Sequence, residues 1–181
     1  MKRLLFVAPV LAFVALIFIF AHGLTQDPSR IPSVMIDRPL PPFRLAGLDG
    51  PDGFASADFG APGHAGEPHL LNLFASWCAA CPAEHPMLFQ IAAAGVPVYG
   101  IDWKDQPDAA RKWLAQLGNP YRRIASDPTA RTGIDLGVTG VPETFVVDGH
   151  GRIRYKQIGP ITAADWHDTL GPMLARLRRE A

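Results

Sequence analysis

The only two cysteines of the chain flank a pair of alanines, in the segment Trp77-Cys78-Ala79-Ala80-Cys81-Pro82. The segment follows an apolar run and precedes a helix-like pattern, so Cys78 falls where the free N–H groups of a helix N-terminus lower the pKa of a thiol. Cys78 is therefore predicted to be the attacking thiol. Cys81 follows within one helical turn, so it can resolve a mixed disulfide formed on Cys78. This spacing predicts dithiol–disulfide exchange.

Three other interpretations of the cysteine pair are a structural disulfide, half of a zinc site and two buried inert thiols. A zinc site needs about four ligands, and the sequence supplies no second Cys-x-x-Cys and no nearby His pair. A structural disulfide across so short a loop would remove little chain entropy. Redox exchange is the favoured interpretation, and we expect the site to need no metal and no cofactor.

The N-terminal residues predict either a transmembrane anchor or a cleaved signal peptide, and both would export the rest of the chain. Lys2 and Arg3 precede an uncharged apolar run, Leu4 to Ala21, which just reaches the span of a bilayer and lacks a convincing cleavage site. We favour a single transmembrane anchor over residues 1–24 rather than a cleaved signal peptide. The positive residues place the N-terminus in the cytoplasm, so the rest of the chain is expected in the periplasm, facing away from the inner membrane. In that oxidising compartment a lone Cys-x-x-Cys pair suggests a working redox couple.

Composition limits the nature of the exported part of the chain. The sequence has 181 residues, 48% hydrophobic content and zero formal net charge, which suits one globular domain and gives no basic excess for a nucleic-acid partner. Residues 25–42 are rich in proline and predict an extended tether. The globular domain is then expected over residues 43–181.

The pattern within this domain predicts strands that alternate with helices and end in a hairpin and a helix, an α/β architecture. The expected strands are Phe43–Leu45, Phe54–Phe59, Leu70–Ala75, Val96–Trp103, Tyr121–Ser126, Thr144–Asp148 and Arg152–Ile158. The expected helical segments are Pro82–Gly95, Gln106–Leu117, Thr129–Leu136 and Thr162–Arg179. We predict a mixed, mostly parallel central sheet with helices on both faces.

This order of elements resembles the thioredoxin fold. The residues that carry the resemblance are the Trp77-Cys78-x-x-Cys81 motif, Pro86 in the following helix and the downstream Val141-Pro142 pair. The resemblance implies a cis peptide bond at Pro142, in a loop that faces the active-site disulfide. The backbone before it, at Val141, would then be an open edge for a substrate strand.

Longer motifs narrow the resemblance to the CcmG/DsbE family and cover roughly Leu40 to Ile158. They are Leu71-Asn72-Leu73-Phe74-Ala75-Ser76-Trp77-Cys78, Ala83-Glu84-His85, Gly100-Ile101-Asp102-Trp103-Lys104-Asp105, Leu117-Gly118-Asn119-Pro120-Tyr121 and Asp135-Leu136-Gly137-Val138-Thr139-Gly140-Val141-Pro142-Glu143-Thr144-Phe145. Members of that family are membrane-anchored periplasmic thioredoxin-like reductants of cytochrome c maturation. The resemblance implies that the chain reduces the Cys-x-x-Cys-His haem-attachment site of apocytochrome c, directly or through a maturation partner. It also implies re-reduction by a membrane electron donor of the DsbD or CcdA type.

Further site residues are suggested by their places in these motifs. Thioredoxin carries a buried Asp where this chain has Asn72, and Glu84 is the expected replacement as proton shuttle for Cys81. Glu143, beside Pro142, is expected to read the substrate, as the family's acidic residue on this loop would. Trp77 is expected to pack beside the disulfide and to contact substrate together with Val141.

Two alternative functions stay open at this stage. One is a general periplasmic thioredoxin-like reductase or oxidant of other substrates, because the Ala79-Ala80 dipeptide departs from the proline-containing pairs of relatives and leaves the redox potential open. The other is a non-enzymatic protein that holds copper or an apocytochrome peptide, with His85 completing a copper site beside the two thiolates.

Overall fold

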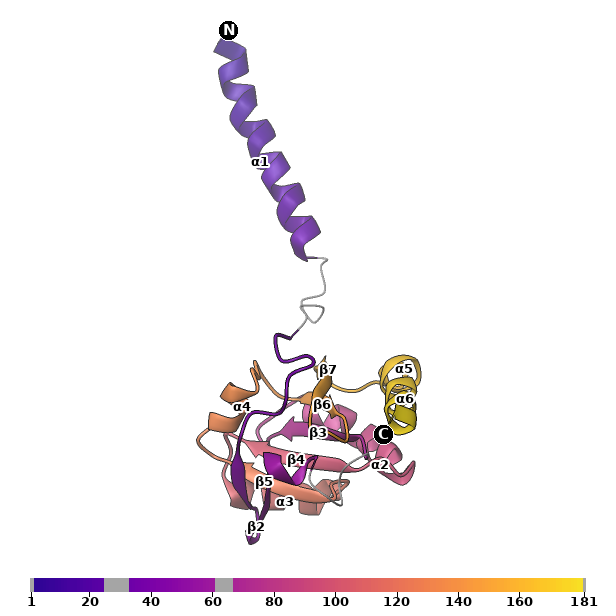
Figure 1. The fold of residues 1–181 in the computed structure, drawn as a ribbon. Coiled ribbons are helices and arrows are strands. Elements are labelled where there is room, and N and C mark those ends of the chain that lie inside the picture. The colour runs from indigo at the N-terminus through magenta and orange to yellow at the C-terminus, as the bar shows by residue number, and fades with distance from the viewer. Residues whose placement is uncertain (1, 25–32, 61–66, 181) are drawn as a thin grey trace. The chain divides into compact units, whose positions relative to one another are not determined.

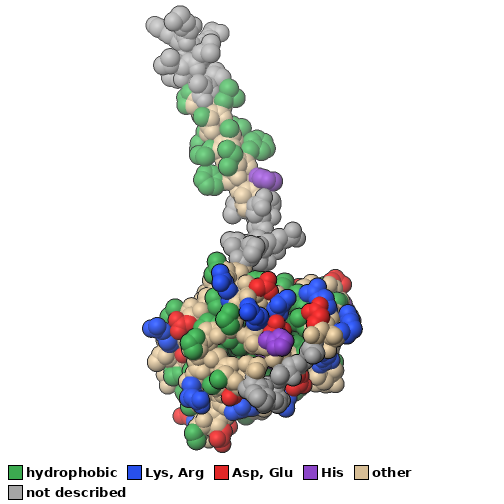
Figure 2. All heavy atoms as spheres, viewed as in Figure 1, with side chains coloured by type: hydrophobic (Ala, Val, Ile, Leu, Met, Phe, Trp, Pro, Cys, Tyr) green, Lys and Arg blue, Asp and Glu red, His purple; other side chains and the backbone are tan. Residues whose placement is uncertain are grey.

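The computed structural model describes residues 2–24, 33–60 and 67–180 of the chain. It divides into two compact units, Met1–Ile31 and Pro32–Ala181, and each is described by itself. The first unit holds helix α1, Lys2–Leu24, whose described side chains are mostly apolar and exposed (Figure 2). No helix among the described residues meets the length and apolarity required to cross a membrane. The helix is therefore present where the anchor was expected, but the structure does not confirm a membrane span.

The second unit is built on a seven-stranded sheet with the order β2-β1-β5-β4-β3-β6-β7. The strands are β1 Arg44–Gly47, β2 Gly50–Ala55, β3 His69–Phe74, β4 Val98–Trp103, β5 Arg123–Asp127, β6 Glu143–Val147 and β7 Ile153–Ile158. Only the central β3, β4 and β5 pair in parallel, and every other pairing of these seven strands is antiparallel. The sheet is mixed as expected, but the expectation of a mostly parallel sheet is wrong because a hairpin at each end of the domain adds antiparallel strands.

The helices of this unit are short and agree with the sequence pattern (Figure 1). They are α2 Cys81–Ala93, α3 Pro107–Leu117, α4 Arg131–Asp135, α5 Ala163–Asp165 and α6 Gly171–Glu180, with a 3-10 turn η2 at Ser56–Asp58 and a π-helical turn η3 at Trp166–Leu170. Thr162 caps α5, since its Oγ1 accepts the N–H of Asp165. The π-helical turn interrupts the single helix that was expected there.

Strand β3 separates the two apolar layers of the domain, and all of its residues are buried. Leu70 and Phe74 point to the layer that contains the buried residues of α2, α3 and α6. Leu71 and Leu73 point to the opposite layer, which contains Leu40 and Leu136. Side chains alternate along a strand, so Asn72 lies on the α2 side of the sheet. The sheet therefore places a single polar side chain of β3 under the helix that begins at Cys81.

The second half of the expected tether is part of the domain. The N–H groups of Asp37 and Leu40 donate to the carbonyl oxygens of Ile153 and Gly151, at 2.7 and 2.9 Å, and Leu40 is buried. The segment thus covers the start of edge strand β7. Prolines alone gave no sign of this, because the contacts depend on the distant β7. The first half of the expected tether, residues 25–32, lies outside the described residues.

Candidate active site

The two cysteines form a disulfide at the N-terminus of α2. Their Cα atoms are 5.5 Å apart, and Cys81 is the first residue of the helix. Cys78 keeps 5% of its surface exposed and Cys81 only 1%, so Cys78 is the more accessible sulfur. The backbone N–H of Cys81 points at Cys78 Sγ at 3.0 Å. After reduction this N–H is placed to donate a hydrogen bond to a thiolate at Cys78.

The turn before Cys78 is held by the segment that follows β4. The N–H of Ser76 donates to Asp105 Oδ2 at 2.6 Å, and the indole N–H of Trp77 donates to the carbonyl oxygen of Lys104 at 3.0 Å. Despite this bond the Trp77 side chain remains 53% exposed. The residue next to Cys78 thus carries a large aromatic side chain of which about half is exposed to solvent.

The loop before β6 closes the other side of the disulfide. The Val141–Pro142 peptide bond is cis, as the thioredoxin resemblance implied. The carbonyl oxygen of Val141 lies 3.4 Å from Cys78 Sγ. Two segments more than sixty residues apart in the sequence thus meet at the reactive sulfur.

Glu84 lies on α2, one turn after Cys81, and is 1% exposed. Its Oε1 accepts an N–H of the Asn72 side chain at 2.8 Å, and its Oε2 accepts the backbone N–H of Ile161 at 3.0 Å. Burial raises the pKa of Glu84 from 4.5 to about 7, because desolvation of the carboxylate outweighs these two hydrogen bonds. The group can therefore take up or release a proton near neutral pH.

Glu143 was expected to read the substrate, but its carboxylate is turned into the domain. Its side chain is 1% exposed and its Oε2 lies 2.8 Å from Nζ of Lys156, a buried ion pair. Its Oε1 accepts both the backbone N–H and the hydroxyl of Thr139. Glu143 therefore holds the loop that carries Pro142, and its carboxylate does not face a substrate in this conformation.

The contacts made by several residues of the site could not be predicted from the sequence alone. Lys156 is one, since its partnership with Glu143 depends on the β6–β7 register, in which Glu143 faces Ile158. Asp105 is another, because only the fold brings it to Ser76. Asn72 did give a signal, as a lone amide in an otherwise apolar strand, but its partners Tyr121 and Thr144 did not.

His85 and Asp102 are two further buried ionisable groups near the site. His85 Nε2 lies 3.0 Å from the carbonyl oxygen of Gly118, and burial lowers the pKa of its ring. The ring packs against Trp113 with centroids 4.8 Å apart, so this histidine is a core residue rather than a free ligand. Burial, with the charge of Asp105, raises the pKa of Asp102 to about 8.

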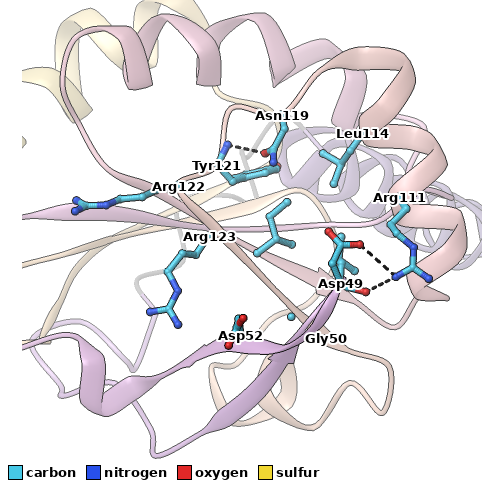
Figure 3. A pocket seen from close by; sticks show the side chains of 12 residues that line it. Asp49, Gly50, Asp52, Arg111, Leu114, Asn119, Tyr121, Arg122 and Arg123 are labelled. Atoms are coloured by element: carbon cyan, nitrogen blue, oxygen red, sulfur yellow. Dashed lines mark hydrogen bonds and ion pairs between the residues drawn. The ribbon is translucent and has the colours of Figure 1, made fainter.

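A pocket of about 520 Å³ lies apart from the cysteines, between β1, β2, α3 and the start of β5 (Figure 3). Three arginines line it, and each already has an acidic partner. Arg111 pairs with Asp108 and Asp49, Arg122 with Glu67, and Arg123 with Asp58. The three arginines of this pocket are thus paired with carboxylates within the domain.

The fold and this site define a thioredoxin-like thiol:disulfide oxidoreductase. The sequence profile of the Redoxin family matches residues 37–170. The thiol:disulfide interchange protein DsbE of Vibrio cholerae serotype O1 is 40% identical over 185 residues, which cover 99% of this chain and 98% of the relative. The DsbE protein of Pseudomonas fluorescens biotype C is 41% identical over 181 residues, with 100% and 99% covered.

A solved structure agrees with these relatives. The crystal structure described as a putative thiol:disulfide interchange protein DsbE from Chlorobium tepidum superposes with a TM-score of 0.65 at 27% identity, covering 80% of this chain and 99% of that chain. The chain therefore belongs to the DsbE (CcmG) family of thiol:disulfide interchange proteins. The family resemblance and the thioredoxin-like fold expected from the sequence are both confirmed.

Proposed function

We propose that this protein reduces the disulfide of an apocytochrome c haem-attachment site, or of a maturation partner that carries it, before haem is joined to the two cysteines. The observation that carries the proposal is the polarised cysteine pair: the Cys81 N–H points at Cys78 Sγ, and the more buried Cys81 stands behind it. Membership of the DsbE family supports a reductive role in this process.

The reaction consists of two thiol–disulfide exchanges. In the reduced protein, the Cys78 thiolate attacks one sulfur of the substrate disulfide, forms a mixed disulfide and releases the other substrate sulfur as a thiolate, which takes a proton from solvent. Cys81 then loses its proton and attacks Cys78 Sγ, which forms the Cys78–Cys81 disulfide, breaks the mixed disulfide and releases the second substrate sulfur as a thiolate that takes up a proton. Two electrons pass to the substrate, and the protein ends in the oxidised state seen here.

In this mechanism Glu84 is the proton acceptor for Cys81. The carboxylate lies one turn from Cys81 on the same helix, and its pKa of about 7 matches the pH at which it must exchange protons. Trp77, with half of its surface open, and the backbone of Val141 before Pro142 form the surface that we propose contacts the substrate chain. Glu143 holds the loop that carries Val141 and Pro142, because its carboxylate accepts the hydroxyl of Thr139.

The proposed cellular setting is a consequence of the reaction. The oxidised pair needs electrons from outside the compartment, so we propose a membrane electron donor of the DsbD or CcdA type. We also propose a periplasmic domain that is attached to the inner membrane by the N-terminal segment, on the basis of Lys2 and Arg3 before the apolar run. Fractionation of the cells and protease access from the periplasmic side test this placement.

The experiment uses the full-length protein and a peptide with an oxidised Cys-x-x-Cys-His motif. Reduced wild-type protein should convert the peptide to its dithiol form. Cys81→Ser should accumulate a mixed disulfide with the peptide, visible by mass spectrometry, because the resolving thiol is missing. Cys78→Ser should neither reduce nor trap it. A Cys78→Ser protein with full reductase activity would overturn the proposal, and a wild-type protein that reduces an unrelated disulfide peptide equally fast would favour the general reductase.

A further inference from the structure

The side chain of Asn72 is the centre of a buried polar cluster beneath the active-site helix. Asn72 is 0% exposed, and its Nδ2 donates both to Glu84 Oε1 at 2.8 Å and to Thr144 Oγ1 at 2.9 Å. Its Oδ1 accepts the hydroxyl of Tyr121 at 2.8 Å. The amide thus joins β3, β6, α2 and the segment before β5 at one point. Each polar atom of the amide has a partner, as a buried amide requires.

The partners determine which way the amide faces. An ionised Glu84 only accepts hydrogen bonds, so Nδ2 must face it, and Oδ1 must then face Tyr121. If the amide turned over, its oxygen would meet the carboxylate of Glu84, and only a protonated Glu84 could bond to it. In the structure the hydroxyl of Tyr121 donates to Oδ1 and so supports the orientation that an ionised Glu84 requires.

Tyr121 is itself fixed from several sides. Its ring stacks on Phe74 with centroids 4.9 Å apart. Figure 3 shows its backbone N–H donating to Asn119 Oδ1, at 2.9 Å. Gly100 of β4 leaves the space for the ring, since a Cβ there would lie 3.0 Å from Tyr121 ring atoms. The hydroxyl is therefore delivered to Asn72 by packing that does not involve Glu84.

We propose that Tyr121 and Asn72 are positioning residues for Glu84, and that together they set the pH range over which this carboxylate accepts the proton of Cys81. The inference rests on the proposed role of Glu84 as the proton acceptor. The Asn72 N–H stabilises the ionised form of Glu84 against the cost of its burial. Loss of the Tyr121 hydroxyl frees the amide to turn, which weakens that stabilisation.

Other ionisable groups surround the cluster. Cys81 and His85 lie on α2 with Glu84, and Asp102 lies on β4, where its charge acts on Tyr121. Burial and the charges of Glu84 and Asp102 raise the pKa of Tyr121 well above 10, so its hydroxyl keeps its proton at neutral pH. The direct contacts to Glu84 that favour its charge are the donors from Asn72 and Ile161.

A titration of Glu84 tests the inference without using the thiol chemistry. The full-length oxidised protein is labelled with carbon-13 at the glutamate carboxyl groups, and the signal of Glu84 is assigned with Glu84→Gln. Tyr121→Phe keeps the stacked ring and removes only the hydroxyl, so its Glu84 midpoint should rise by about half to one pH unit. Asn72→Ala removes the donor itself and should raise the midpoint further.

Tyr99→Phe is the matched control. Tyr99 is also a buried aromatic residue, but it lies in the layer on the other side of the sheet, away from Asn72. The midpoint of the Glu84 titration in the Tyr99→Phe protein should equal that in the wild-type protein. An unchanged midpoint in Tyr121→Phe, or an equal shift in Tyr99→Phe, overturns the inference.

The reductive half-reaction provides a second readout. The rate at which Cys81 releases a mixed disulfide from Cys78 should rise with pH through the Glu84 midpoint, and that rise should move upward by the same interval in Tyr121→Phe. If the Glu84 midpoint shifts in Tyr121→Phe but the pH dependence of the rate does not, Glu84 is not the proton acceptor for Cys81. That result would overturn the link to proton transfer, whereas the positioning of Glu84 by Asn72 would stand. Absence of exchange in the wild-type protein would instead overturn the proposed function.

Discussion

At the scale of single residues, the two buried glutamates of the site have different environments and different roles. Glu84 is buried among neutral donors and titrates near neutral pH, whereas Glu143 is buried against a lysine and supports a loop. The sequence motifs identified both as acids near the cysteines but could not distinguish these environments. The distinction depends on Lys156 and Asn72, which meet the two carboxylates only after the sheet has formed.

Glu84→Gln should remove a pH-dependent part of the stability. The folded-state pKa of about 7 lies above the ordinary 4.5, so the folded state binds this proton more tightly than the unfolded state. The resulting stabilisation is complete below pH 4.5 and is lost as the pH rises through 7, a change of roughly 3 kcal/mol. Urea unfolding of the oxidised wild type and variant over this range measures it. A constant difference in unfolding free energy between the two proteins would contradict this assignment.

At the scale of elements, the β6–β7 hairpin positions the loop that carries Pro142. Lys156 on β7 reaches Glu143 on β6, and its Nζ also donates to the carbonyl oxygen of Gly137 at 2.7 Å. Thr139 adds a contact from the loop itself to Glu143. The sequence pattern predicts the hairpin but not its cross-strand contacts, because they depend on the pairing register.

Lys156→Met should destabilise the protein by about 3–5 kcal/mol, since it leaves the Glu143 carboxylate buried without its partner. Glu143→Gln combined with Lys156→Met should recover most of this loss, because no uncompensated charge remains. Urea unfolding of the single and double variants gives both values. A single variant as stable as the wild type, or a double variant no better than the single, would rule out the buried ion pair.

At the scale of the whole molecule, the order of elements was largely readable from the sequence, and the pairing of the sheet was less so. Buried strands such as β3 are mostly apolar, and helices such as α3 show a clear repeat, so both are predicted close to their observed bounds. The sequence pattern does not reveal that the strands on either side of the parallel centre pair in the opposite direction, β1 with β2 and β5, and β6 with β3. Proline-rich composition predicts a tether over residues 33–42, because composition carries no information about their hydrogen bonds to the start of β7.

The central claim is that the Cys78–Cys81 couple donates electrons to its substrates, and its reduction potential tests this most directly. The full-length protein is equilibrated in dithiol or glutathione buffers, and the change in Trp77 fluorescence reports the oxidised fraction. We predict a reducing couple with a potential toward that of thioredoxin, about −270 mV. A potential near that of DsbA, about −120 mV, would make the protein an oxidant and contradict the proposed role.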